Sequence, residues 1–190
     1  AVAVSKIKHA GIAKIFDVGF LSGDRPYLVM EFLDGETLAA RVRRQGRLPL
    51  TQLIDVTQQI AGVLEATHAE QITHRDLKPD NIFVVRDTEL ASGERIKVLD
   101  FGIAKLGAVS SGSAPTTSSM GTPAYMSPEQ WRATSTVDGR ADVYSLGCVM
   151  FELASGRTPF VATSMGEMCD QHLNNPPPSV RPLVSSLPAS

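Results

Sequence analysis

Two polar segments bracket one short predicted hairpin, and this arrangement constrains the chain more than any other feature of its sequence. The segment HRDLKPDN occupies residues 74–81, and LDFG occupies residues 99–102. Between them, two apolar runs flank the polar stretch RDTELASGE, a pattern typical of two strands at residues 82–85 and 96–99. Before them, apolar residues recur at helical spacing over residues 51–68, which predicts an amphipathic helix with one buried face. The sequence therefore predicts two loops that carry acidic residues, one just before the first strand of this hairpin and one just after its second strand.

The rest of the chain divides into short segments with distinct local patterns. Residues 11–19 and 25–33 are rich in β-branched and aromatic residues and are separated by FLSGD, which predicts a first hairpin. Residues 106–121 are nearly all small, hydroxylated or turn-forming, which is typical of a surface loop. Residues 141–155 are apolar on almost every side, so we expect a helix surrounded by protein, and residues 165–173 predict a short helix. This order indicates a mixed α+β fold.

Composition narrows the class of protein. The chain has 190 residues, a formal net charge of -2 and 43% hydrophobic residues, which fits one globular domain. Its near-neutral charge argues against a nucleic-acid partner. Cys148 and Cys169 are too few for a disulfide framework and lack the spacing of a zinc site, so we expect reduced, buried thiols. No apolar run approaches a membrane span and the first residues lack a signal-peptide pattern, so we expect a soluble, cytoplasmic chain.

Four motifs in this order resemble the protein kinase family. HRDLKPDN is similar to the catalytic loop of that family, and LDFG to its metal-binding motif. GTPAYMSPE is similar to its substrate-docking loop and APE motif, with Ser127 in place of the Ala, and DVYSLG is similar to the start of its central buried helix. The strings HRDLKPDNIF and GTPAYMSPEQ are similar to bacterial serine/threonine kinases of the eukaryotic type. The resemblance implies a protein-kinase-like α+β fold with a partial small lobe and hinge at residues 1–33, an incomplete and mostly helical large lobe at residues 34–190, and an activation segment at residues 100–129.

The resemblance implies transfer of the γ-phosphate of ATP to a protein hydroxyl group. That reaction needs two oxygens in line, neutralised negative charge and an acceptor for the proton of the hydroxyl. Asp76 is the candidate acceptor, and Lys78 would place a positive charge against the γ-phosphate. Asn81 and Asp100 supply oxygen ligands from two loops, which suits Mg²⁺ because this ion keeps waters and phosphate oxygens in its shell. An isolated Asp or Asn in a loop is usually only a turn-forming residue, but the intact octapeptide with LDFG favours catalysis.

Adenine recognition is expected at the end of the first hairpin. By resemblance, Met30 is the gatekeeper at the back of the nucleotide pocket, and the backbone of Glu31 and Leu33 binds the edge of adenine. Phe83 would cover the base from below, where the family often has a smaller aliphatic residue. The alternative is that Met30 and Phe83 are plain core residues, and the two interpretations are compatible.

Supporting roles follow from the same resemblance. The family stacks an apolar spine at positions that correspond to Val4, Ile15, His74 and Phe101. His74 is therefore expected to be a packed, hydrogen-bonded core histidine rather than an acid or a metal ligand. Asp142 is expected to hold the catalytic loop from behind by accepting its backbone N–H groups, which would offset the cost of burying a carboxylate. No motif surrounds His9, His68 or His172, so no role is assigned to them.

The activation segment carries candidate regulatory residues. Arg75 marks the kind of kinase in which this arginine pairs with a phosphate on the activation loop, since a phosphate offers oxygens that a guanidinium can engage. The candidate acceptors of that phosphate are Ser110, Ser111, Ser113, Thr116, Thr117, Ser118 and Ser119. The alternative is a merely flexible loop. Lys78 together with Thr122 in the substrate-docking loop is the pattern of kinases that modify serine and threonine, so we expect protein substrates with such acceptors, and self-phosphorylation among them.

Parts of the family pattern have no counterpart in these residues. No G-x-G-x-x-G occurs, and no VAIK-like strand precedes the first hairpin. The family pairs the Glu of its APE motif with an Arg from helices that would follow residue 190, so Glu129 is expected to have no obvious partner. We therefore expect an internal piece of a serine/threonine kinase, with weak or no activity by itself. Poor solubility is also expected, because the first hairpin leaves an unpaired edge.

Two other functions are alternatives to an active kinase. A short protein without the phosphate loop and its Lys would be a pseudokinase, a binding module without catalysis. The complete set of Asp76, Lys78, Asn81 and Asp100 argues against this, because a binding module has no chemical need for all four. Small-molecule phosphotransferases share the broad fold, but GTPAYMSPE suits a peptide substrate better. Bacterial kinases of this type are often receptors, so this stretch could be the cytosolic part of a membrane-anchored protein.

Overall fold

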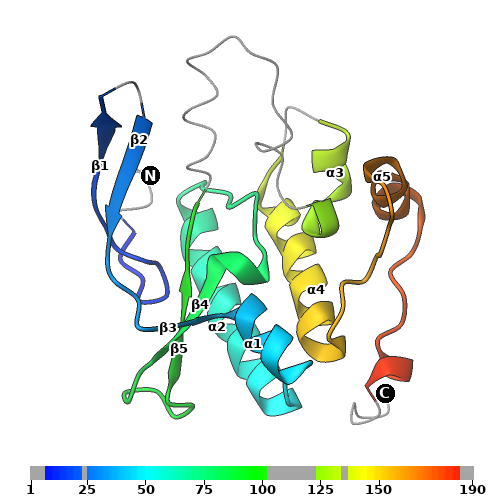
Figure 1. Cartoon of the computed structure of the whole chain (residues 1–190), viewed down its shortest axis with the longest axis horizontal. Helices are drawn as coiled ribbons and strands as arrows, with labels where there is room; N and C mark the ends of the chain where they lie inside the picture. The colour runs from blue at the N-terminus through cyan, green and yellow to red at the C-terminus, as the bar shows by residue number, and fades with distance from the viewer. Residues whose placement is uncertain (1–6, 23–24, 102–122, 134–136, 185–190) are drawn as a thin grey trace.

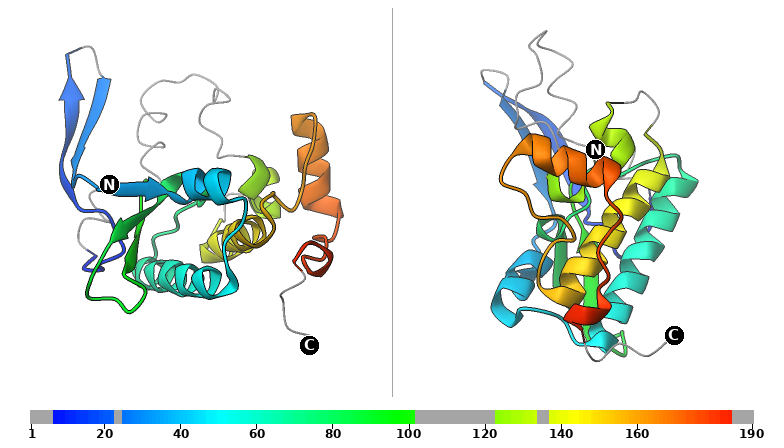
Figure 2. Two further views of the ribbon diagram at one scale, coloured as in Figure 1. Left: turned by 60° about the horizontal axis from the view of Figure 1, so that its bottom comes forward. Right: turned by 90° about the vertical axis from the view of Figure 1, so that its right-hand side faces the viewer.

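The chain folds into a β hairpin, a three-stranded sheet and a group of helices packed beside that sheet (Figure 1). The computed structural model describes residues 7–22, 25–101, 123–133 and 137–184. The hairpin stands to one side of the helices in the left view of Figure 2, and α5 lies at the opposite side. Strands and helices thus form an α+β arrangement, as the sequence predicted.

The first hairpin consists of β1 (Ile15–Leu21) and β2 (Arg25–Met30), which pair antiparallel with an irregularity between Ile15 and Asp17. The predicted hairpin is confirmed, but its first strand begins later than expected. The preceding residues pair elsewhere: Ile12 forms a parallel bridge with Val98, and the Val98 N–H donates to the Gly11 carbonyl at 2.8 Å. The chain therefore touches the three-stranded sheet before it enters the hairpin.

The three-stranded sheet has the order β3–β4–β5, with both pairs antiparallel. β4 (Ile82–Arg86) and β5 (Glu94–Val98) confirm the second predicted hairpin. β3 (Gly35–Thr37) was not predicted. A Cβ atom at Gly35 would lie 2.1 Å from the carbonyl oxygen of Val84, so only glycine allows this close approach to β4.

A helix that the sequence analysis did not predict follows β3 directly. α1 (Leu38–Gln45) begins after Thr37, whose Oγ1 accepts the N–H of Ala40 at 3.0 Å, and ends at Gly46, which has a φ of 80°. Arg41 points from this helix to Glu94 in β5, with its two terminal nitrogens 2.7 and 2.8 Å from the carboxylate oxygens. This bidentate pair ties α1 to the edge strand of the sheet.

Two long helices run side by side at the centre of the molecule (Figure 1). α2 (Leu50–Ala69) confirms the helix predicted at residues 51–68, and α4 (Gly139–Ser155) carries the apolar run at residues 141–155. Their buried side chains join those of the sheet in one hydrophobic core, which includes Ile60, Val63, Ile82, Val98, Val149 and Leu153. The short helix α3 (Pro128–Trp131) precedes α4, and α5 (Met165–Asn174) confirms the short helix predicted at residues 165–173.

Two expectations about burial need correction. α4 is not surrounded by protein within the described part of the chain, because Val143 is 61% exposed and Met150 is 37% exposed. Cys148 is buried as expected, and burial raises the pKa of its thiol to about 12. Cys169 is only half-buried, and both thiols are free. None of the helices in the described ranges is long and apolar enough to cross a lipid bilayer.

Candidate functional site

The predicted catalytic loop brings three of its polar side chains together. Lys78 Nζ lies 3.0 Å from Asp76 Oδ2, and Asn81 Nδ2 lies 3.3 Å from the same oxygen and 2.9 Å from the Asp76 carbonyl. Asn81 ends a 3₁₀ turn, Pro79–Asn81, whose first residue is a proline that fixes the backbone after Lys78. The Asp76 side chain keeps 34% of its surface exposed, so a substrate group can reach it.

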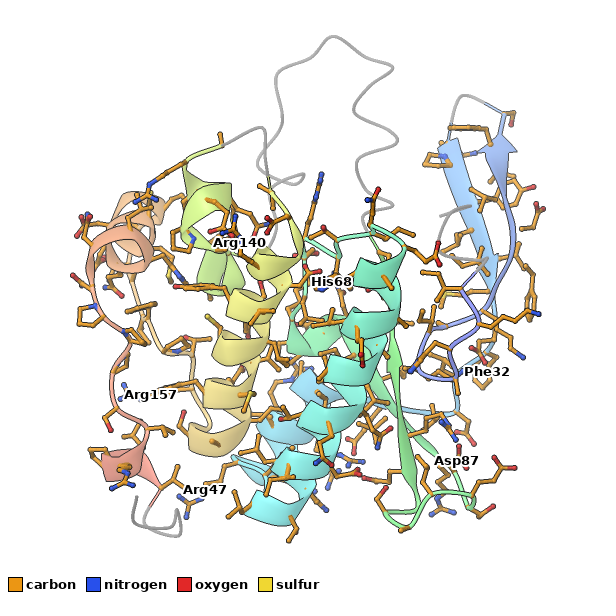
Figure 3. All side chains as sticks on the ribbon, turned by 180° about the vertical axis from the view of Figure 1, so that it is seen from behind. Phe32, Arg47, His68, Asp87, Arg140 and Arg157 are labelled. Atoms are coloured by element: carbon orange, nitrogen blue, oxygen red, sulfur yellow. The ribbon has the colours of Figure 1, made fainter. Side chains whose placement is uncertain are left out.

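Asp142 holds this loop from behind, as the sequence analysis expected. It lies in the first turn of α4 and is fully buried, and its Oδ2 and Oδ1 accept the N–H groups of His74 and Arg75, both at 2.8 Å. His68 was assigned no role, but its Nε2 lies 2.7 Å from Asp142 Oδ2. His68 projects from the last turn of α2 toward α4 (Figure 3). A buried carboxylate thus has three donors from two elements, which compensates for its desolvation.

His74 is a packed core histidine. It is fully buried, its ring centroid lies 4.7 Å from that of Phe101, and its Nε2 lies 2.8 Å from the Leu99 carbonyl. Burial lowers the pKa of His74, although Asp142 opposes this effect. A depressed pKa favours the neutral ring, which suits an interior position and argues against an acid role. Ile15 is half-buried at the start of β1, and Val4 lies outside the described residues.

The two candidate metal ligands lie at adjoining points of two loops. The Asn81 carbonyl accepts the N–H of Leu99 at 2.9 Å, and Asp100 is the next residue. Asp100 has a φ of 57°, which turns the chain sharply after β5, and its side chain is exposed. Because the Asn81 amide nitrogen donates to Asp76, its amide oxygen is the atom that would meet a cation. The described residues contain no group of three or more His, Cys, Asp or Glu side chains arranged to hold a metal.

The expected adenine-binding residues lie in or between the two sheets: Met30 ends β2, Glu31 and Leu33 connect β2 to β3, and Phe83 lies in β4. Glu31 follows β2 and makes two hydrogen bonds with the backbone of Lys14, the residue before β1. The Glu31 N–H donates to the Lys14 carbonyl at 2.9 Å, and the Glu31 side-chain Oε1 accepts the Lys14 N–H at 2.7 Å. The Glu31 carbonyl, not its N–H, is therefore the backbone group that could face adenine. Lys97 Nζ in β5 also lies 2.7 Å from Glu31 Oε1. Burial raises the pKa of Glu31, but the hydrogen bonds from Lys97 and the Lys14 amide outweigh it and leave the pKa below its usual value.

Phe83 lies on the face of the three-stranded sheet that meets this hinge segment. It pairs across the sheet with Lys97, so the two side chains share a face, and Lys97 reaches Glu31. Phe83 is half-buried, whereas its strand neighbours Ile82 and Val84 point into the core. Met30 and Leu33 are also half-buried. Phe32, which lies between them in sequence, is 92% exposed (Figure 3). This arrangement agrees with a nucleotide-facing side for Phe83, although its role stays a prediction.

The segment after the activation loop contacts the catalytic loop. Ser127 is fully buried before α3, and Gln130 of α3 donates from Nε2 to the Arg75 carbonyl at 2.7 Å. Gln130 was not predicted to have a role. The expectation that Glu129 lacks a partner is wrong: it is half-buried, and its charge, after that of Asp138, helps to raise the pKa of Arg140. Arg140 lies at the start of α4 (Figure 3).

Of the candidate regulatory residues, the described part of the chain contains Arg75. Arg75 is exposed and its Nη2 lies 3.4 Å from the Val137 carbonyl. Its candidate phosphate partners Ser110, Ser111, Ser113, Thr116, Thr117, Ser118 and Ser119, and the substrate-docking Thr122, lie outside the described residues. The predicted surface loop at residues 106–121 lies there too.

Comparisons with known proteins establish the family of the chain. The family model described as the protein kinase domain matches residues 2–181. The chain is 44% identical over 189 residues to the serine/threonine-protein kinase Pkn1 of Myxococcus xanthus, covering 98% of this chain and 26% of the relative. It is 39% identical over 174 residues to the serine/threonine-protein kinase PknB of Mycobacterium leprae, covering 90% of this chain and 27% of the relative. The chain spans about a quarter of the length of these curated relatives. With a family match over nearly its whole length, the chain belongs to the protein kinase family.

Proposed function

We propose that these residues form the acceptor side of the phosphoryl-transfer site of a serine/threonine protein kinase, with ATP as donor and Mg²⁺ as its counterion. The observation that carries the proposal is the convergence of Lys78 Nζ and Asn81 Nδ2 on one oxygen of Asp76. A carboxylate held by two donors keeps one orientation, which is what a group that must meet a substrate hydroxyl requires. The family membership supports the same reading.

Asp76 orients the substrate hydroxyl and accepts its proton as the oxygen becomes bonded to phosphorus. Lys78 supplies a positive charge that stabilises the transferred phosphoryl group. Asn81 and Asp100 would hold Mg²⁺, which neutralises charge on the phosphates when it is bound. Their oxygen donors fit this ion, since the Leu99 to Asn81 hydrogen bond keeps the two loops adjoining. Asp142 and His68 keep the loop in place through the His74 and Arg75 amides.

The wider setting of the reaction is part of the same proposal. Met30, the Glu31 carbonyl, Leu33 and Phe83 would contact adenine. Lys78 and Thr122 favour serine and threonine acceptors in protein substrates, and Arg75 would receive a phosphate that self-phosphorylation places on the activation segment. Because ATP is supplied in the cytosol, the site would work on the cytoplasmic side of any membrane to which a longer protein is anchored.

The test is transfer of labelled γ-phosphate to a serine or threonine peptide by the product of the whole reading frame that contains these residues. Asp76→Asn should lower the rate at least about a hundredfold, because the loop loses its proton acceptor but keeps its contacts. Asp87→Asn is the matched control, since Asp87 lies at the turn of β4 and β5 (Figure 3), at the end of β4 opposite to the catalytic loop, and pairs with Arg95. It should leave the rate within about twofold of the unmodified protein.

Two results would contradict the proposal. Full transfer by Asp76→Asn would remove Asp76 from the chemistry. Nucleotide binding with no transfer by the unmodified protein would identify a pseudokinase. For the 190 residues alone we expect slow or no transfer, because they contain no G-x-G-x-x-G to hold the phosphates. Rapid transfer by the 190-residue chain, lost in Asp76→Asn, would show that expectation to be wrong.

A further inference from the structure

The peptide unit before Asp76 has an unfavourable backbone conformation. Arg75 has a φ of 66°, in the left-handed region where a Cβ atom crowds the following carbonyl. Such a residue keeps this conformation only when surrounding groups hold it there. Any group that holds Arg75 therefore helps to set the direction in which the Asp76 side chain leaves the backbone.

Two side chains from different elements hold this residue at its two ends. Asp142 of α4 accepts the Arg75 N–H at 2.8 Å, and Gln130 of α3 donates to the Arg75 carbonyl at 2.7 Å. The Asp142 contact belongs to the catalytic-loop support described above. The Gln130 contact reaches the same residue from the segment that leads out of the activation loop, and α3 lies just before α4 in the chain and beside it in Figure 1.

Gln130 uses both ends of its side-chain amide. Its Nε2 donates to Arg75, while its Oε1 accepts the N–H of Ser127 at 3.0 Å and lies 3.2 Å from the Ser127 hydroxyl. Ser127 is fully buried and begins α3. The Oε1 contact is the half of a capping box that Glu or Gln normally supplies. Only an amide can make both contacts, because a carboxylate has no N–H to donate to the Arg75 carbonyl.

We propose that Gln130 is a positioning residue that ties the end of the activation segment to the backbone of Arg75 and so fixes the orientation of Asp76. A shift of α3 moves the Gln130 amide, and the strained Arg75 peptide then loses one of its two side-chain contacts. The catalytic meaning of this link rests on the proposed function, whereas the link itself does not.

Gln130→Glu separates the two contacts. The variant keeps an oxygen for the Ser127 N–H, so α3 should be retained and the melting temperature should fall less than in Gln130→Ala, but it loses the donor to Arg75. Amide hydrogen exchange at residues 74–78 should then be about three- to tenfold faster, the effect expected from one lost hydrogen bond. Gln130→Ala loses both contacts and should show the same faster exchange together with a lower melting temperature.

Gln171→Glu is the matched control. Gln171 of α5 donates from Nε2 to the Val161 carbonyl at 3.0 Å, so the variant loses the same kind of bond and gains the same charge away from the catalytic loop. It should leave exchange at residues 74–78 unchanged. The proposal is overturned if amide exchange at residues 74–78 in Gln130→Glu equals that of the unmodified chain, whether or not Gln130→Ala exchanges faster. The hydrogen bond from Gln130 Nε2 would then not hold Arg75.

The catalytic arm uses the product of the whole reading frame. Gln130→Glu should lower kcat about tenfold with little change in KM for ATP, because Asp76 and not the nucleotide site is disturbed. Unchanged kcat beside faster exchange would overturn the coupling to catalysis. Faster exchange in Gln130→Glu, combined with full activity in Asp76→Asn, would instead disprove the proposed function and leave the structural link standing.

Discussion

His172 is a buried residue that should make stability depend on pH. It is 3% exposed, and its ring meets Phe160 at 4.8 Å, Tyr144 at 5.7 Å and Trp131 at 6.2 Å between centroids. Its Nδ1 lies 2.7 Å from the Tyr144 hydroxyl, while its Nε2 is buried and has no hydrogen-bond partner among the described residues. Burial lowers the pKa of His172 below 6.5, so the unfolded chain takes up a proton that the folded chain refuses. Stability contributed by the neutral ring is therefore present above pH 6.5 and is lost as the pH falls below it.

His172→Phe should flatten this dependence, because phenylalanine keeps an aromatic ring and does not titrate. Between pH 7 and 5, the free energy of unfolding should fall less steeply in the variant, by up to about 1.4 kcal/mol per pH unit. The measurement is urea unfolding at several pH values, and only slopes are compared, so a change in stability at pH 7 does not matter. The pKa of His74 is lowered too, so some dependence should persist. Equal slopes in both proteins would contradict the prediction.

Residues of the site differ in how far the sequence could reveal them. Asp76, Lys78 and Asn81 could be predicted because they belong to one octapeptide, and a local turn brings them together. His68 and Gln130 could not, because their partners lie 74 and 55 positions away in the chain. Helical periodicity places His68 on α2 but does not say which helix it faces. Contacts of this kind depend on packing between elements, which local pattern does not encode.

Substitutions at two glycines, one inside α4 and one at its C-terminal cap, should change the stability of the protein in opposite directions. Gly147 lies inside the helix, and no described residue has an atom within 4 Å of where its Cβ would be. Gly147→Ala should therefore stabilise the protein by about 0.5–1 kcal/mol through reduced backbone entropy of the unfolded chain. Gly156 ends the helix with a φ of 81°, and its Cβ would lie 2.4 Å from the Gly46 carbonyl oxygen. Gly156→Ala should cost about 2 kcal/mol or more, from left-handed strain and this clash.

Denaturant unfolding of both variants checks the pair, with each serving as the control for the other. A loss of stability in Gly147→Ala would mean that the apparent space beside α4 is filled. The end of α4 and the turn after α1 are also joined by a hydrogen bond from the Leu48 N–H to the Leu153 carbonyl at 2.8 Å. If Gly156→Ala were tolerated, the contact between these two segments would not be tight.

Element prediction missed one strand and one helix, β3 and α1, which follow each other directly in the chain. β3 has three residues and α1 has eight, too few for periodicity to identify. The capping signals at Thr37 and Gly46 could have indicated α1, because a threonine and a glycine flank the helix in the positions that such residues favour. For α4 the apolar pattern predicted the helix but not its exposure, since sequence does not say which sides other elements cover. Val143 and Met150 are exposed for this reason.

At the scale of the whole molecule, the relation between the two sheets is what the sequence revealed least. Motif order predicted a hinge after the first hairpin, but not the contacts that fix it. The Ile12 to Val98 bridge and the Lys97 to Glu31 ion pair join the hairpin to β5, although these partners are far apart in sequence. Within the described ranges, the Ala13 N–H also donates to the Val98 carbonyl at 3.3 Å, so backbone pairing and an ion pair both join the two sheets. The division into two lobes at residue 33 stays a prediction.

The first hairpin should make the 190-residue chain self-associate. β1 and β2 pair only with each other among the described strands, so their outer backbone groups form open edges. Three large apolar side chains of β1 are mostly exposed: Phe16 at 66%, Phe20 at 69% and Leu21 at 54%. A two-stranded sheet with exposed apolar side chains is a template for pairing with another copy.

Sedimentation velocity of the 190-residue chain should therefore show mass that rises with concentration in the micromolar range. Phe20→Lys should reduce this association, because a charge on an edge strand opposes pairing with a second copy. Val143→Lys is the matched control, because the exposed fraction of Val143, 61%, is similar to that of Phe20. Val143 lies on α4, however, and a helix satisfies its own backbone groups. If both substitutions reduce association equally, exposed apolar surface and not the open strand edge drives it. A monomer at every concentration with one cooperative melt would show that the hairpin is stable without further strands.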